Sequence, residues 1–157
     1  MNKFFSKREN IINIAIIFLI AIFFIIDRFL KKIAINSLEE KNILGEVLKF
    51  TFTPNRYIAF SIPVEGFFLN LFISLITFLI FTYSIFLSYK KRNFELLGFL
   101  AIFFGALSNL IDRFKHSFVI DYFDFYHFSV FNLADVSIFF GSFFLLYFYL
   151  KGNDKKK

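Results

Sequence analysis

Four long apolar runs constrain the fold of this 157-residue chain more than any other feature. They cover about residues 11–30, 67–87, 94–111 and 131–150. Each is close to the roughly 20 residues that an α-helix needs to cross a bilayer. Lipid offers no hydrogen-bond partner to the backbone, so only helices and closed barrels span it. We therefore predict a membrane all-α fold, in which residues 1–157 form a single integral membrane domain: a four-transmembrane-helix bundle with outer loops at 31–66 and 112–130.

The first apolar run raises an alternative, because a basic start followed by an apolar run is also the pattern of a secretory signal peptide. Three basic residues precede this run, yet no small-x-small cleavage site follows it. The run ends instead at Asp27-Arg28 and a further hydrophobic pair. We interpret it as a first span that is retained in the protein.

Lysine and arginine are distributed as the positive-inside rule predicts. Of these 18 side chains, 10 lie in the N-terminal arm, the link at 90–92 and the C-terminal tail. Both termini and the link are therefore expected to face the cytoplasm, and the net charge of +6 needs no nucleic-acid partner to explain it. Asp27, Asp112 and Asp135 would then share the outer edge of the membrane, with the long 31–66 loop on the same side.

The 31–66 loop contains a strand pattern. Leu48, Phe50 and Phe52 alternate with polar residues, a period of two that is typical of a half-buried strand. Pro54-Asn55 predicts a turn, and residues 57–62 predict a returning strand. We therefore expect a small extracytoplasmic β-rich region outside the bundle.

Small residues mark one face of the third apolar run. They recur at steps of three or four residues, and polar residues continue the same face: Gly98, Ala101, Gly105, Ser108, Asn109 and Asp112. Small residues let helices approach closely in a membrane. This face is therefore expected to contact another helix closely and to lead into a polar site.

Carboxylates and amides cluster around the third and fourth runs. The pattern Asn-x-x-Asp occurs twice, as Asn109 to Asp112 and as Asn132 to Asp135, and Asp121 lies between the two. Carboxylates at such positions are costly and are usually functional. Two carboxylates held together away from water do not both ionise easily, so one retains a proton while the other is charged. Such a pair is able to activate water for attack on a peptide carbonyl.

The aspartates are also compatible with ion pairing or with transport. Asp27 and Asp112 both have basic neighbours in the sequence, and interfacial ion pairs would account for them. A small proton- or ion-coupled carrier would also use intramembrane aspartates, although the span interiors hold almost no ionisable groups. The chain has no cysteine and only two histidines, which excludes a cysteine nucleophile and argues against a zinc site. We expect no metal and no cofactor.

Several of these residues belong to five short motifs that follow one another along the chain. The motifs are Asp27-x-x-x-Lys31, Asn55 with Ala59-Phe60, Gly105-Ala-Leu-x-Asn109-x-x-Asp112-Arg113, Val119-x-Asp121-Tyr-Phe-Asp-Phe-Tyr126 and Phe131-Asn132-x-Ala134-Asp135. In this order they resemble the motifs of the bacterial lipoprotein signal peptidases, also called signal peptidase II.

The resemblance implies a membrane aspartic endopeptidase. Such an enzyme removes the signal peptide from diacylglyceryl-modified prolipoproteins by cleaving before the lipidated cysteine. It implies Asp121 and Asp135 as catalytic residues, and the remaining motif residues as substrate-binding or supporting: Asn55, Asn109, Asp112, Arg113, Asn132, Asp27 and Lys31. The residue pattern alone does not choose Asp121 over Asp112 as the partner of Asp135, so both pairs stay open here.

The resemblance also implies where the protein works and with what. Its partners would be lipid-modified prolipoproteins and membrane phospholipid, and it would act as a monomer. Its location would be the bacterial cytoplasmic (inner) membrane, with a multi-pass topology and the active site at the outer face.

Overall fold

The computed structural model describes residues 2–37, 39–57, 66–126 and 129–154. Four helices make up most of it: α1 (Asn2–Ile35), α2 (Phe67–Tyr89), α3 (Asn93–His116) and α4 (Leu133–Asp154). Each contains a stretch long and apolar enough to cross a membrane. Large apolar side chains such as Phe18, Phe78 and Phe143 are exposed along them, which suits contact with lipid rather than water. The predicted four-helix membrane fold with a small sheet is confirmed.

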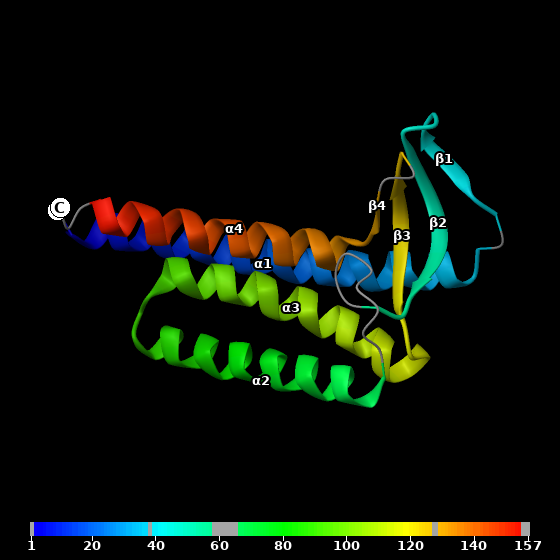
Figure 1. Ribbon diagram of the computed structural model, residues 1–157. Coiled ribbons are helices and arrows are strands. Elements are labelled where there is room, and N and C mark those ends of the chain that lie inside the picture. The colour runs from blue at the N-terminus through cyan, green and yellow to red at the C-terminus, as the bar shows by residue number, and fades with distance from the viewer. Residues whose placement is uncertain (1, 38, 58–65, 127–128, 155–157) are drawn as a thin grey trace.

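The helices lie side by side, and a sheet stands across one end of the bundle (Figure 1). α1 and α4 pack along each other and against α3, and α2 packs against the other side of α3. The start of α1, the end of α4 and the link between α2 and α3 all lie at the end away from the sheet. This arrangement brings the carboxyl end of α1, the carboxyl end of α3 and the amino end of α4 together beneath the sheet.

All four helices extend beyond the spans predicted for them, and two of them continue into the segments predicted as outer loops. α1 continues through Lys31 to Ile35, and α3 continues through Asp112 to His116. Lys31 and Asp112 therefore lie in helices, whereas the predicted loops 31–66 and 112–130 included them. Helix persists there because these side chains form an ion pair across the two helices. Where each helix leaves the bilayer, and hence the boundaries of the membrane domain, stays a prediction.

The sheet is antiparallel and has four strands in the order β1 (Lys41–Leu44), β2 (Leu48–Asn55), β3 (Val119–Phe125) and β4 (Ser129–Phe131). The strand predicted from the alternation at 48–53 is confirmed as part of β2. The turn predicted at Pro54-Asn55 is wrong, because β2 continues through both residues and pairs there with β3. β1 is paired only as far as Phe50, so Pro54 needs no amide hydrogen on that side. The returning strand expected at 57–62 falls mostly outside the described residues.

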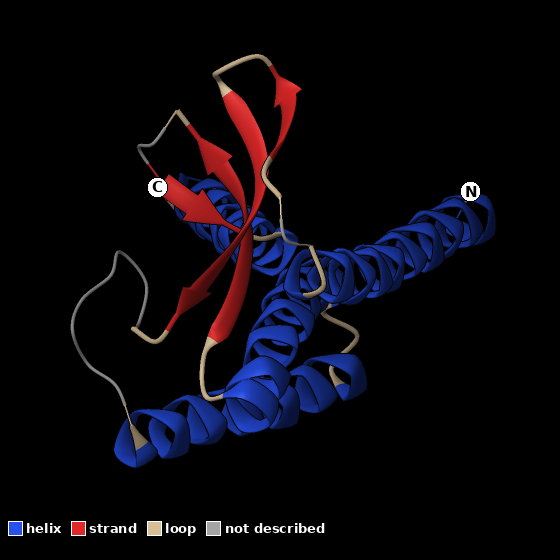
Figure 2. Cartoon of the chain, turned by 90° about the vertical axis from the view of Figure 1, so that its right-hand side faces the viewer, coloured by secondary structure: helices blue, strands red, loops and turns tan. Residues whose placement is uncertain are grey.

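A small apolar core fixes the sheet to the end of α1. Ala34 of α1 is buried against Phe50, Ile120 and Tyr122, which come from β2 and β3. Figure 2 shows the strands standing over the helix ends. The helix-to-strand change after α3 occurs at Ser117, whose left-handed backbone (φ 66°) turns the chain from α3 into β3. Because Asp121 belongs to β3, it lies at the end of the bundle where the sheet stands.

The small face predicted for the third run does mediate close helix contact. Gly105 of α3 lies so near α4 that a Cβ atom placed on it would be 2.5 Å from the carbonyl oxygen of Ala134. No larger residue fits without separating the helices, because real Cβ contacts do not approach that distance. Gly105 therefore brings the polar end of α3 next to the first turn of α4.

Candidate active site

Asp135 lies in the first turn of α4, in a capping box. The Asn132 Oδ1 atom accepts the backbone N–H of Asp135 at 2.9 Å, and Asp135 Oδ2 accepts the backbone N–H of Asn132 at 3.2 Å. Asn132 is the N-cap residue and Asp135 the third residue of the helix, so the spacing Asn-x-x-Asp is the sequence form of this reciprocal cap. The same pair of hydrogen bonds fixes the rotamer of the carboxylate.

Asn132 also holds Asp121. Its Nδ2 atom donates to Asp121 Oδ1 at 2.6 Å, while Asn55 Nδ2 donates to Asp121 Oδ2 at 2.9 Å. Asn109 Nδ2 donates to the remaining oxygen, Asp135 Oδ1, at 2.8 Å. Every oxygen of the two carboxylates thus accepts one amide N–H, and Asn132 joins both acids. The structure brings together these five residues, which the sequence placed in four separate motifs.

The orientation of two of these amides is set by further bonds. Asn55 Oδ1 accepts the backbone N–H of Tyr57 at 3.0 Å, and Asn109 Oδ1 accepts Lys31 Nζ at 2.7 Å. An amide whose oxygen is occupied in this way has to present its NH₂ group to the other side. Both amides therefore point their donors at a carboxylate.

Asp121 is almost fully buried, with 2% of its surface exposed. Burial, followed by the nearby charge of Asp135, raises the pKa of Asp121 to about 7. The amide bonds from Asn55 and Asn132 act in the opposite direction, but less strongly. Asp135 is partly exposed, so the pair is open to the surroundings on its side. In the described residues, no lysine or arginine forms a salt bridge with either acid.

A second cluster lies beside this pair and is built differently. Lys31 Nζ is 3.2 Å from Asp27 Oδ2 and 2.8 Å from Asp112 Oδ2, and Arg28 Nη1 is 2.5 Å from Asp112 Oδ1. Asp27, Lys31 and Asp112 are buried. Asp27 and Asp112 thus do form ion pairs, but Asp112 pairs with α1 rather than with its own sequence neighbours.

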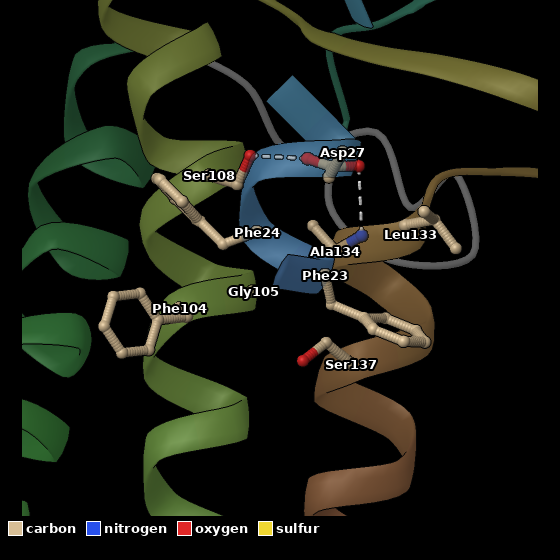
Figure 3. A pocket seen from close by; sticks show the side chains of 9 residues that line it. All are labelled: Phe23, Phe24, Asp27, Phe104, Gly105, Ser108, Leu133, Ala134 and Ser137. Atoms are coloured by element: carbon tan, nitrogen blue, oxygen red, sulfur yellow. Dashed lines mark hydrogen bonds between the residues drawn. The ribbon is translucent and has the colours of Figure 1, made fainter. Parts of the chain in front are cut away.

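Asp27 also binds the start of α4. Its Oδ1 atom accepts the backbone N–H of Ala134 at 3.2 Å, and its Oδ2 atom accepts the hydroxyl of Ser108 at 2.5 Å. Figure 3 shows Asp27 reaching from α1 between Ser108 of α3 and the first turn of α4. The amino end of a helix attracts negative charge, so this position suits an ionised carboxylate. Asp27 therefore connects three helices directly beneath the site.

Arg113 makes its hydrogen bonds to the chain that follows β2. Its guanidinium donates to the carbonyl oxygens of Arg56 and Tyr57, at 3.2 and 2.6 Å. Tyr57 in turn donates its N–H to Asn55. Arg113 thus holds the end of β2 in place and keeps Asn55 near Asp121.

All nine site residues predicted from the sequence lie at this one end of the bundle, in two connected clusters. Sequence reasoning missed three contributors: Arg28 as the partner of Asp112, Ser108 as a donor to Asp27, and Tyr122. Arg28 and Ser108 were visible only as a nearby charge and a small residue, and Tyr122 had no signal beyond its place after Asp121. Within the described residues, no group of three or more His, Asp or Glu side chains is arranged to hold a metal ion.

Comparisons with known proteins point in one direction. A family model described as "Signal peptidase (SPase) II" matches residues 19–151. The chain is 31% identical over 143 residues to the lipoprotein signal peptidase of Clostridium tetani, which covers 86% of this chain and 92% of that protein. It is 32% identical over 157 residues to the lipoprotein signal peptidase of Actinobacillus succinogenes, covering 92% and 94%.

A solved structure agrees with these sequence matches. It is a bacterial membrane enzyme determined by the in meso method at 2.3 Å resolution, and it superposes with a TM-score of 0.77 at 26% identity. The match covers 92% of this chain and 91% of the other. The site geometry, the family match over most of the chain and the likeness to whole relatives lead to one conclusion: this chain belongs to the signal peptidase II family of membrane peptidases.

Proposed function

We propose that this protein is an aspartic endopeptidase that removes the signal peptide from diacylglyceryl-modified prolipoproteins, cleaving before the lipidated cysteine. Asp121 and Asp135 form the catalytic pair. The lipoprotein signal peptidases to which the chain is similar support the substrate class. The geometry of the two clusters supports the mechanism.

Asp121 and Asp135 are set apart from the other buried aspartates by their neutral partners. All four of their oxygens accept amide N–H groups, which orient a carboxylate without cancelling its charge. The paired acids therefore keep the property that catalysis needs, which is a proton shared between two carboxylates that resist ionising together. This is the observation on which the proposal chiefly rests.

The competing pair, Asp112 with Asp135, has weaker support. Asp112 is buried, and its two oxygens are 2.5 Å from Arg28 Nη1 and 2.8 Å from Lys31 Nζ. Both of its oxygens are therefore occupied by cations, which leaves no oxygen free to meet a water molecule or a substrate carbonyl. Asp112 fits a supporting role, in which it fixes Lys31 and through it Asn109.

In the proposed reaction, the charged member of the pair takes a proton from a water molecule. The water oxygen attacks the scissile carbonyl carbon, and the protonated member donates a hydrogen bond to the carbonyl oxygen. When the tetrahedral intermediate collapses, the acid that took the water proton gives it to the leaving amine nitrogen and the C–N bond breaks, which returns the pair to its single shared proton. Asn132 and Asn109 hold the two carboxylates in the same orientation throughout the reaction, since their hydrogen bonds to the acids do not take part in the proton transfers.

The position of the site suits a substrate held in the membrane. The pair lies where the helices end and the sheet begins, so a bond just outside the apolar band would reach it (Figure 1). We place this end at the outer face of the bacterial cytoplasmic membrane, with both termini in the cytoplasm. Substrate would enter beside the partly exposed Asp135, with the 31–66 segment closing over it. The protein would work as a monomer surrounded by phospholipid.

The proposal is tested by cleavage of a lipid-modified prolipoprotein by the purified protein in detergent. Asp121→Asn and Asp135→Asn should each abolish cleavage, because an amide cannot carry the shared proton. Asp124→Asn, three residues further along β3, is the matched control and should leave cleavage intact. Addition of a metal chelator should have no effect.

The possible failures have distinct meanings. Cleavage lost in Asp112→Asn and Asp135→Asn but retained in Asp121→Asn would keep the peptidase and overturn the pair. A well-folded wild-type protein that cleaves no prolipoprotein would contradict the proposed function and revive the carrier alternative.

A further inference from the structure

Among the side chains that the structure describes, Tyr122 is the largest without solvent exposure, and it has no role in the function proposed so far. Its ring packs against Phe50, with 5.6 Å between the ring centroids. Its hydroxyl donates to Asp27 Oδ1 at 2.8 Å and accepts the backbone N–H of Leu133 at 3.0 Å. A residue of β3 thus reaches both α1 and the first residue of α4.

This hydroxyl completes the amino end of α4. A helix begins with four backbone N–H groups that have no partner inside the helix. Here the first is bound by Tyr122, the second by Asp27 and the third by the Asn132 side chain. The remaining one of the four is the N–H of the cap residue Asn132, which Asp135 Oδ2 accepts at 3.2 Å. Two of these partners tie the helix to the strand that carries Asp121: Tyr122, which belongs to that strand, and Asn132, whose Nδ2 atom donates to Asp121 Oδ1 and to the Ile120 carbonyl.

Tyr122 therefore links the two acids, through a peptide bond to Asp121 on one side and a hydrogen bond to the first turn of α4 on the other. It follows Asp121 directly in β3, and the N–H that it binds is two residues before Asp135 in α4. Asn132 joins the same two elements on the side of the carboxylates. We infer that Tyr122 is a positioning residue, whose hydroxyl holds the first turn of α4 against β3 and thereby sets the distance between Asp135 and Asp121. This inference rests on the proposed function of the two acids.

Movement of α4 away from β3 would change the electrostatics of Asp121 measurably. The charge of Asp135 helps to raise the Asp121 pKa to about 7, so withdrawal of α4 should lower that pKa. The other groups that face Asp121 are Lys31 from α1, Arg113 from α3 and the amides of Asn55 and Asn132. None of these bonds to the Tyr122 hydroxyl. Asp27 does, but it retains Lys31, Ser108 and the Ala134 N–H when that hydroxyl is removed.

Tyr122→Phe removes the hydroxyl and keeps the ring. We expect kcat to fall about 10-fold, because small displacements of catalytic groups have effects of this order or larger. KM should stay unchanged, since Tyr122 has no surface open to substrate. The alkaline limb of the kcat/KM profile should move to lower pH, because Asp121 loses part of the influence of Asp135.

Phe50→Leu is the matched control. It weakens the same apolar core around the Tyr122 ring but leaves both hydroxyl bonds in place. It should lower the melting temperature without shifting the pH profile. A pH shift in Phe50→Leu equal to that in Tyr122→Phe would overturn the inference, because loss of packing alone would then explain it.

A double variant separates two effects of Tyr122→Phe: displacement of the first turn of α4, and the free-energy cost of leaving the Leu133 N–H without a partner. Proline suits the first position of a helix and has no N–H, so Leu133→Pro removes the donor that Tyr122→Phe would leave unbound. Tyr122→Phe/Leu133→Pro should be more stable than Tyr122→Phe and should keep the low kcat and the shifted alkaline limb. A return to the wild-type profile would overturn the inference.

Wild-type kinetics in Tyr122→Phe, with Asp121→Asn and Asp135→Asn inactive, would overturn it while leaving the proposed function standing. Activity in both aspartate variants would instead remove the proposed function, and the inference with it.

Discussion

The two clusters at the end of the bundle use the same acidic side chain in opposite ways. Asp27 and Asp112 form ion pairs with Lys31 and Arg28, so their negative charges are neutralised by neighbouring positive charges. Asp121 and Asp135 are held by amide groups and a backbone N–H, so their charges are oriented but not cancelled. The ion-paired cluster joins α1 to α3, and the amide-held pair is the one that we propose to be catalytic. Burial alone does not distinguish them, since acids in both clusters are buried.

The largest effect on stability is expected from Lys31→Met. Lys31 forms salt bridges with two buried carboxylates, so its loss leaves Asp27 without its ion-pair partner and Asp112 with Arg28 alone. Removing one partner from a buried ion pair typically costs about 3–5 kcal/mol. Thermal unfolding in detergent should show a large fall in melting temperature. Lys32→Met, at the exposed neighbouring position, is the control, and an equal loss there would show that the cluster has no special role.

The same chemical change should have opposite effects on stability in the two clusters. Asp112→Asn should destabilise the protein by roughly 3–5 kcal/mol at neutral pH, because it removes the negative charge that pairs with both Arg28 and Lys31. Asp121→Asn should leave the melting temperature unchanged or raise it, because it removes a buried charge that has no cation. Equal melting temperatures in the two variants would remove the distinction between the clusters.

A pH titration of stability sharpens the comparison further. The folded protein binds the Asp121 proton more tightly than the unfolded chain, because the folded pKa is about 7 and the ordinary value is 3.8. The folded state therefore carries more protons between these pH values, and stability falls as pH rises through the window and is level above it. The total is at most about 4 kcal/mol, at about 1.4 kcal/mol for each pKa unit. The slope should become smaller in Asp121→Asn, and an unchanged slope there would assign it to another group.

Cleavage should also fall above about pH 7, as the pair loses its shared proton.

The smallest effect on stability is expected from Asn132→Ser. Serine is a good N-cap, so the bond to the Asp135 N–H can be kept and the stability should change by less than about 1 kcal/mol. Serine is too short to replace the Asn132 amide that donates to Asp121. Cleavage should therefore fall by roughly 10- to 100-fold, the range seen when a supporting hydrogen bond to a catalytic group is lost. Full activity in Asn132→Ser would mean that the bridge between the acids is dispensable.

The four helices and the residues that gather at the end of the bundle could be predicted from the sequence, but most of the hydrogen bonds and ion pairs between those residues could not. Span length and hydrophobicity are local properties, so the four helices were visible directly. The capping box of Asn132 and Asp135 was visible as a spacing, because its bonds run between residues three apart. The ion pair of Arg28 with Asp112 was not visible, because its partners are separated by 84 residues and meet only when α1 packs on α3.

The sheet shows the same limit. The alternation at 48–53 predicts a half-buried strand, but β3 is buried on both faces at Val119–Tyr122 and shows no alternation. Its pairing with β2 could not be foreseen, and neither could the straight passage of β2 through Pro54. The residue pattern left the choice between Asp112 and Asp121 open for a related reason, since it does not show which acid meets a cation from another helix.

The position of Asp135 within a helix cap has a consequence for biogenesis. The amide donors to the two acids come from β2, from α3 and from the residue before α4, so they are distant in the order of synthesis. A nascent chain that has inserted its first three helices holds Asp121 but lacks Asp135, Asn132 and the first turn that aligns them. The proposed catalytic pair is therefore complete only when the last helix docks. If the two acids act as proposed, the protein gains its activity at the final step of folding in the membrane.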